Sequence, residues 1–302
     1  MRYRLAQFVI ILAACSLVGG PHLRAQNASV KIQPDGSCPS SSGSNDTEPS
    51  GSETSIANVT FSGFLQLAIS DQDQIADSIK QQTYEVFDSS VTDEALERTR
   101  LGWQDRGYFK VKVNGYATTL TSSPGDRRIS LNFHVDEGLQ YSLGGIAFKN
   151  NRAVSSTGAL RALFPIDNGD VFSRKQIAKG LVNLSDAYGE MGYVNFTAVP
   201  ETRLDDEKKL IYLNIDIDEG KQFYVEDINV LGLDEPARQG LLKDIPITRG
   251  QIYNSRLWEA SLLKSAVMFP ECRCAQRQPV ARDEGAALVT LTLDFRACLK
   301  NH

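Results

Sequence analysis

The chain has 302 residues, of which 32 are basic, 37 acidic, five Cys and three His. Its 41% of hydrophobic residues is enough for packed cores, and the composition excludes a collagen, a coiled coil, a polytopic membrane protein and a wholly disordered chain. The formal net charge of −5 argues against a nucleic-acid-binding protein, which usually presents a basic face. Length alone allows two domains or three small ones.

Residues 1–25 have the layout of a secretory signal peptide. Arg2 and Arg4 precede the apolar run Phe8–Val18, and Ala25 offers a small residue for cleavage. As a helix this run spans about 16 Å, too short for a hydrocarbon core of about 30 Å, so we expect export without an uncleaved membrane anchor. The residues ending at Cys15 also resemble a bacterial lipobox, which makes lipidation at Cys15 the alternative to cleavage near Ala25.

Residues 26–55 are rich in Ser, Pro and Gly and contain no aromatic residue, which predicts a disordered linker.

The rest of the chain repeats about every 82 residues. Three segments, 128–138, 210–220 and 288–296, alternate apolar and polar residues, as in Ile129, Leu131, Phe133 and Val135. A period of two predicts half-buried strands. Another extended stretch and a polar turn precede each one, which predicts antiparallel hairpins whose first strands cover 108–119, 193–202 and 272–280.

Two helical patterns and a short strand precede each hairpin. The shorter helices are expected at 71–86, 157–163 and 235–244, and the short strands at 56–64, 143–149 and 225–231. The longer helices have cap residues near Thr92, at Ser173 and at Asn254. Gly107 and Gly192 stand where the first two of these helices end.

Each unit therefore has the order β-α-α-β-β, an α+β fold in which two helices pack on one face of a three-stranded sheet. We expect units at 56–140, 141–222 and 223–298. The other face of each sheet is polar, as at Ser130, Asn132 and His134, and is expected to lie in solvent.

Four cysteines lie beyond the signal peptide, at positions 38, 272, 274 and 298. Because exported proteins fold in an oxidising environment, cysteines in such a chain are expected to form disulfides. If the third hairpin turns at Gly285, Cys272 lies opposite Cys298, so we predict a Cys272–Cys298 disulfide, with Cys274–Cys298 as the alternative.

Two short glycine motifs are repeated in the first two units. Gly107 and Gly192 each precede a Tyr, and Gly138 and Gly220 each close an Asp-Glu-Gly exit. Together with the element order, these repeated motifs resemble tandem POTRA (polypeptide-transport-associated) domains, the periplasmic arm of BamA-like and TamA-like outer-membrane assembly proteins. The third unit departs from the pattern at Met268-Phe269-Pro270 and Phe295-Arg296. In that family a membrane β-barrel follows the last unit, and the few residues after Cys298 predict a chain without one.

Catalysis has little support in the sequence. No catalytic, cofactor-binding or metal-binding residue is predicted, because His134 lies on a polar strand face and no phosphate-binding loop follows a strand. Acidic pairs such as Asp136/Glu137 and Asp205/Asp206 are interpreted as solvated strand ends and turns.

The resemblance implies an exported scaffold that takes part in outer-membrane protein assembly or transport. In the family the second strand of each sheet accepts an extended client by backbone pairing. Here that implies contacts at Tyr108, Lys110, Lys112, Tyr193, Asn195 and Thr197. The expected partners are unfolded outer-membrane polypeptides or a barrel-type assembly protein, with no nucleic acid, in the periplasm and peripheral to the outer membrane. The alternatives are a cell-division or envelope adaptor, and the N-terminal fragment of a barrel assembly protein.

Overall fold

The computed structural model describes residues 54–84, 89–123, 126–269 and 281–296. The predictions for the signal peptide, for Cys15, for most of the linker and for the Cys272–Cys298 disulfide lie outside these residues.

Three units follow one another along the chain. The first contains β1 (Thr54–Ser62), α1 (Ile69–Lys80), β2 (Thr83–Tyr84), α2 (Ser89–Gln104), β3 (Lys112–Ser123) and β4 (Asp126–Asp136). The second contains β5 (Ser142–Lys149), α3 (Thr157–Arg161), α4 (Arg174–Glu190), β6 (Thr197–Asp205) and β7 (Leu210–Asp218). The third contains β8 (Tyr224–Leu231), α5 (Glu235–Asp244), α6 (Ser255–Met268), β9 (Ala281–Asp283) and β10 (Leu288–Asp294).

The predicted α+β fold is confirmed in all three units. The sheet orders are β2-β1-β4-β3, β5-β7-β6 and β8-β10-β9. In each sheet the last strand is central, with the first strand parallel to it and the second antiparallel. The helix predicted at 71–86 is wrong at its end, because α1 ends at Lys80 and Thr83–Tyr84 form the short strand β2, which extends the first sheet beyond β1.

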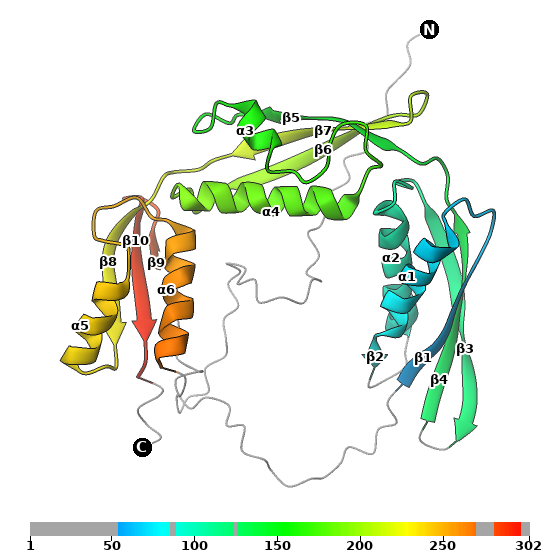
Figure 1. Cartoon of the computed structure of the whole chain (residues 1–302), viewed down its shortest axis with the longest axis horizontal. Helices are drawn as coiled ribbons and strands as arrows, with labels where there is room; N and C mark the ends of the chain where they lie inside the picture. Colours follow the sequence, from blue (N-terminus) through cyan, green and yellow to red (C-terminus); the bar gives the residue numbers. More distant parts are fainter. Residues whose placement is uncertain (1–53, 85–88, 124–125, 270–280, 297–302) are drawn as a thin grey trace.

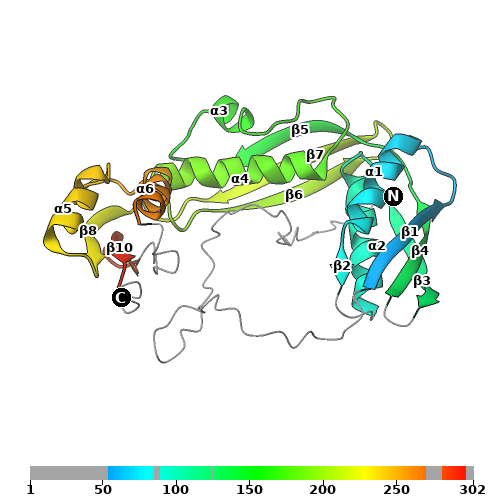
Figure 2. The ribbon, with the colours of Figure 1, turned by 60° about the horizontal axis from the view of Figure 1, so that its bottom comes forward.

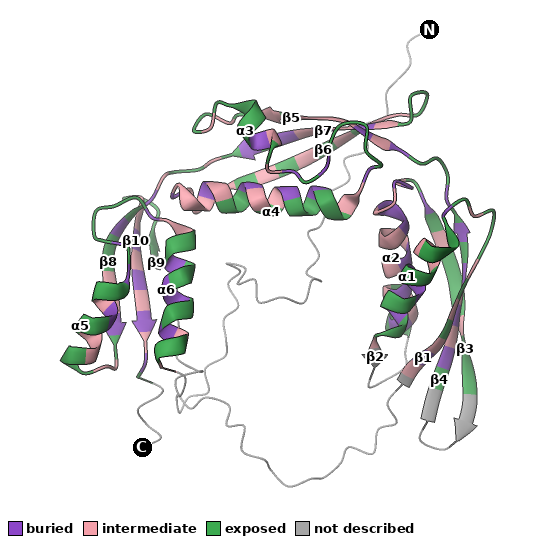
Figure 3. Ribbon diagram, viewed as in Figure 1, coloured by how far each residue is buried: buried purple, intermediate pink, exposed green. Residues whose placement is uncertain are grey.

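The alternating residues of the central strands form the cores, as Figure 3 shows for β7 and β10. Ile129, Leu131, Phe133 and Val135 of β4 face α1 and α2 and pack with Trp103. The corresponding residues of β7 and β10 belong to equivalent, separate clusters. Each unit thus has its own core between one sheet and two helices.

Helix starts and strand starts differ in how well they were predicted. The side chains of Ser173 and Asn254 cap α4 and α6, as expected, whereas the cap predicted near Thr92 is wrong because α2 already begins at Ser89. The second strands begin later than predicted, at Lys112 and Thr197. Gly107 has a φ of 89° and Gly192 of 85°, and the residues after each form a turn before the strand begins.

Figure 1 shows the three units arranged as an arch, with α2, α4 and α6 along its inner side and the sheets outward. The turned view in Figure 2 shows α4 and α6 meeting where the second and third units join.

Candidate functional site

The second strand of each unit lies at the edge of its sheet. Among the described residues, β3, β6 and β9 each pair with the central strand on one side only. Backbone groups on the other side are open to another extended chain, and this is the chemistry expected of a polypeptide-binding module. For the third unit the structure describes this edge over Ala281–Asp283 alone, so 272–280 lie outside it.

The two tyrosines named as candidate contacts lie before the strands and face inward. Tyr108 is 4% exposed and belongs to the first core. The ring of Tyr193 packs edge-on against Tyr188 with centroids 5.7 Å apart. Both side chains stabilise the turn that follows a glycine, and neither lies on an open strand edge.

Lys110 and Asn195 are in contact with the next unit. Lys110 Nζ forms an ion pair with Asp206 at 2.7 Å, and Asn195 Oδ1 accepts a hydrogen bond of 2.8 Å from Arg282. Of the six candidate contacts, Lys112 and Thr197 are the two that begin the edge strands, and both are exposed.

The two joints between units use the same backbone atoms. In the first, the Gly107 carbonyl accepts a hydrogen bond from the amide of Tyr141 at 2.8 Å. In the second, the Gly192 carbonyl accepts one from the amide of Phe223 at 2.9 Å. The side chains of Gln140 and Gln222 donate to backbone carbonyls beside these glycines, each at 2.9 Å. Gly107 and Gly192 therefore have two roles. Each follows the end of a helix in the left-handed conformation, and its carbonyl accepts a hydrogen bond from the first residues of the next unit.

An ion pair crosses each joint, Lys110 with Asp206 at 2.7 Å in the first and Arg256 with Glu190 at 3.4 Å in the second. Asp206 accepts hydrogen bonds from Lys110 and from the hydroxyl of Tyr141, the latter at 2.7 Å. The hydrogen bonds from Lys110 and then Tyr141 lower the pKa of Asp206, and the bond to Asp206 raises the pKa of Lys110. In the second joint Phe223 occupies the place of Tyr141 and has no hydroxyl group.

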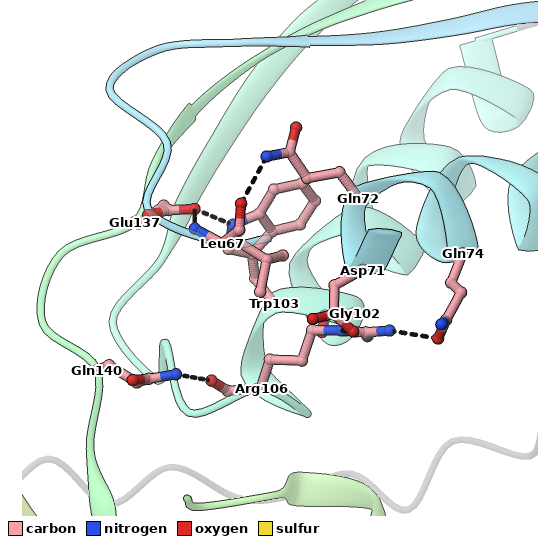
Figure 4. A network of polar contacts seen from close by, with 9 residues as sticks. All are labelled: Leu67, Asp71, Gln72, Gln74, Gly102, Trp103, Arg106, Glu137 and Gln140. Atoms are coloured by element: carbon pink, nitrogen blue, oxygen red, sulfur yellow. Dashed lines mark hydrogen bonds and ion pairs between the residues drawn. The ribbon is translucent and has the colours of Figure 1, made fainter. Parts of the chain in front are cut away.

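Figure 4 shows a buried polar network centred on Glu137, which is 2% exposed. Its carboxylate accepts hydrogen bonds from the amides of Gln66 at 2.6 Å and Leu67 at 3.1 Å, and from Trp103 Nε1 at 2.8 Å. The interpretation of Glu137 as a solvated strand-end residue is therefore wrong. Its carboxylate fixes the loop after β1 to the end of α2, and the three donors offset the cost of its burial.

The second unit repeats this arrangement with other residues. Glu219 accepts hydrogen bonds from the amide of Ala153 at 2.8 Å and from the hydroxyl of Tyr188 at 3.0 Å. Burial and then this bond raise the pKa of Tyr188. In the third unit Phe269 packs against Phe295, with ring centroids 5.1 Å apart. Phe295 has the place of Ile217 in its sheet, and the position equivalent to Glu219 lies outside the described residues. The sequence signal that was overlooked is an aromatic donor near the ends of α2 and α4, together with a Glu after β4 and after β7.

The described residues do not form a metal centre. Within them, no group of three or more His, Cys, Asp or Glu side chains is placed to hold a metal ion. His134 lies on the outer sheet face, where its Nδ1 is 3.5 Å from the hydroxyl of Ser62. A hollow of about 350 Å³ beside it is lined by Phe64, Gln66 and residues 134–138. None of the helices described has the length and apolar character needed to cross a membrane.

Comparison with known proteins assigns the family. The POTRA model, described as a surface antigen variable number repeat, matches residues 54–138 and 141–220, more than half of the chain. A putative outer membrane protein assembly factor of Treponema pallidum is 26% identical over 162 residues, 53% of this chain and 19% of the relative. The outer membrane protein assembly factor BamA of Buchnera aphidicola is 23% identical over 184 residues, 60% of this chain and 29% of the relative.

The chain thus spans less than a third of the length of these curated relatives. The crystal structure of POTRA3-5 of Haemophilus influenzae BamA has the same fold, with a TM-score of 0.59 and 20% identity over 82% of this chain and 98% of that one. With the repeated sheets and joints described above, these matches show that the chain belongs to the POTRA family.

Proposed function

We propose that this chain is an exported, non-enzymatic scaffold that binds extended polypeptides during outer-membrane protein assembly. The observation that carries the proposal is the placement of the second strand at an open sheet edge in consecutive units. The names of the two relatives, both assembly factors, support the same process. An open edge pairs through backbone groups, so it accepts many client sequences.

The joints support a scaffold role. Each unit has its own core, and the same hydrogen bonds set each unit against the one before it. The sheets of successive units are therefore held in a defined order, which suits a chain that guides a long client. The proposed location is the periplasm, peripheral to the outer membrane, with nascent outer-membrane polypeptides or a barrel-type assembly protein as partners.

The test is site-specific photo-crosslinking in the native envelope. A photoreactive residue replaces Lys112 or Thr197 at the start of an edge strand, and the control replaces Lys179, which is exposed on α4. Crosslinked products are identified by mass spectrometry. The proposal predicts outer-membrane polypeptides or assembly proteins from at least one edge position. Products that are the same from position 179, or that include no envelope protein, would contradict it.

A further inference from the structure

The two edge strands that the structure describes in full present different backbone groups to solvent. In a strand, consecutive residues point their amide and carbonyl groups to opposite sides. Only the residues directed away from the central strand can pair with an incoming chain. Which residues these are follows from the register of each sheet.

In the second unit the outward set includes a proline. The amide of Ser142 on β5 donates to the carbonyl of Lys209 at 2.9 Å, so Ile211 and the alternate residues after it direct their backbone groups toward β5. The intervening residues of β7 face β6, where Asn214 is opposite Glu201. The outward residues of β6 are therefore Ala198, Pro200, Thr202 and Leu204.

Pro200 has no amide hydrogen, and it stands within this outward set. An incoming strand would meet a carbonyl at this position without its matching donor. β6 also carries Glu201 and Arg203, so its edge combines a proline with charges. These are the features by which natural sheets prevent edge-to-edge pairing.

In the first unit the outward set is complete. The hydroxyls of Thr60 and Ser62 on β1 reach the carbonyls of Leu131 and Phe133 at 3.4 and 3.1 Å, so these residues of β4 face β1. The intervening residues face β3, where Asn132 is opposite Tyr116. The outward residues of β3 are therefore Val113, Gly115, Ala117 and Thr119, and each has an amide hydrogen.

Over residues 113–120, β3 also lacks the other protections, and the shift in its pairing with β4 comes after this stretch, between Thr121 and Ser123. Residues 113–120 contain neither a proline nor a charge. Tyr116 is 65% exposed and Leu120 is 37% exposed on the sheet face away from the helices, beside the open edge. If a client strand paired with this edge, every second client side chain would lie beside Tyr116 and Leu120. The edge therefore fits a client in which apolar and polar residues alternate.

The opposite edges carry irregularities. The pairing of β1, β5 and β8 with their central strands shifts at Ala57, Gly144 and Glu226, and β2 covers the start of β1. Bulges of this kind interrupt the regular spacing that a new strand needs.

We propose that the open edge of β3, and not that of β6, is the client-binding edge of the first two units, and that Pro200 closes β6. The ligand is an extended segment that alternates apolar and polar residues and carries no proline. This inference rests on the proposed function, because it names which of the open edges performs it.

The experiment uses the full chain and a synthetic peptide of about ten residues that alternates Val or Tyr with Thr. Amide hydrogen exchange reports which strand the peptide protects, and fluorescence anisotropy of labelled peptide gives the affinity and stoichiometry. We expect protection at Val113, Gly115, Ala117 and Thr119, and no new protection at Ala198 or Thr202.

Four variants test whether the outward amides cause this selectivity. Ala117→Pro removes a central outward amide, and at least tenfold weaker binding is expected, whereas Ala117→Ser keeps the amide and should bind as the parent does. Thr119→Pro, at an exposed position, serves the same purpose if Ala117→Pro fails to fold. Pro200→Ala restores the missing donor in β6, so a second site with protection at Ala198 and Thr202 is expected.

The outcomes separate this inference from the function on which it rests. Equal protection of β3 and β6 in the parent chain would overturn the selectivity and leave edge binding intact. Undiminished binding by folded Ala117→Pro and Thr119→Pro variants, or no second site in Pro200→Ala, would also overturn it. Absence of protection at both edges would instead contradict the proposed polypeptide-binding function.

Discussion

The indole nitrogen of Trp103 donates a hydrogen bond of 2.8 Å to the carboxylate of Glu137, a pair that joins the end of α2 to the exit of β4 inside the first core. Both partners are essentially inaccessible to solvent, and two backbone amides complete the shell of the carboxylate. The pair therefore stabilises the unit only while the indole and both amides keep the carboxylate of Glu137 as their acceptor.

The first prediction concerns Glu137→Gln, which keeps the shape of the side chain. One carboxylate oxygen becomes an amide group that points its hydrogens at a donor, so a loss of about 1–3 kcal/mol in the free energy of unfolding is expected. Urea denaturation followed by Trp fluorescence measures it. Asp136→Asn, at the exposed neighbouring residue, is the control and should stay within about 0.5 kcal/mol. Equal stability of the two variants would contradict the role given to Glu137.

The second prediction concerns the first joint and its dependence on pH. The pKa of Asp206 is lowered in the folded chain, so its contribution is present above the ordinary value of 3.8 and is lost as the pH falls through the folded value. The pair is exposed, so the free energy involved is below about 1 kcal/mol, and orientation is the more sensitive readout.

Spin labels at Asp93 on α2 and Lys179 on α4 report that orientation, since both sites are exposed. Asp206→Asn at neutral pH should broaden the distance distribution, as acidification of the parent chain should. Glu207→Gln removes the same charge from the same turn and should leave the distribution narrow. A broadening of equal size in both variants would assign the effect to net charge and not to the Lys110 pair.

The third prediction compares two glycines with positive φ. Gly107→Ala introduces a Cβ within 2.8–2.9 Å of Val171, Gln140 and the Tyr141 carbonyl, at a φ of 89°. Gly169→Ala has a similar φ of 95° but open space around it. Both variants bear a conformational cost of about 1–2 kcal/mol. Thermal unfolding should show that Gly107→Ala lowers the stability clearly more than Gly169→Ala does, because the new Cβ at residue 107 also disturbs the joint.

The fourth prediction is a stabilising change. Gly240 lies within α5, and a Cβ there meets nothing within 4 Å, so Gly240→Ala should add about 0.5–1 kcal/mol to the stability of the third unit. Gly180→Ala on α4 is the matched contrast, because its Cβ would lie 2.0 Å from the ring of Phe164. It should destabilise the second unit. Calorimetry resolves the two effects, and a loss of stability in Gly240→Ala would contradict the assignment.

Sequence reasoning recovered the fold because the fold depends on local patterns. The alternation in β4, β7 and β10 and the caps at Ser173 and Asn254 are properties of neighbouring residues. The short strand β2 was assigned to the helix predicted at 71–86, because its two residues carry no periodicity of their own.

The site was predicted less well because its contacts join residues far apart in the chain. Lys110 and Asp206 are 96 positions apart, and nothing near either residue indicates that they meet. Glu137 was taken as solvated because an acidic pair at a strand end usually is, and only the folded chain places Trp103 above it. The edge strands were placed correctly by order, but which residues face outward depends on the register.

The aromatic–carboxylate pair also constrains how such units diverge. Trp103 with Glu137 and Tyr188 with Glu219 are two versions of one contact. A mutation that removed the hydrogen-bond donor from either ring, or the carboxylate from its Glu, would leave the remaining partner without its match. The ring can therefore change from an indole to a phenol between units, but the side chain at this position must keep a donor that reaches the Glu as long as the Glu is present.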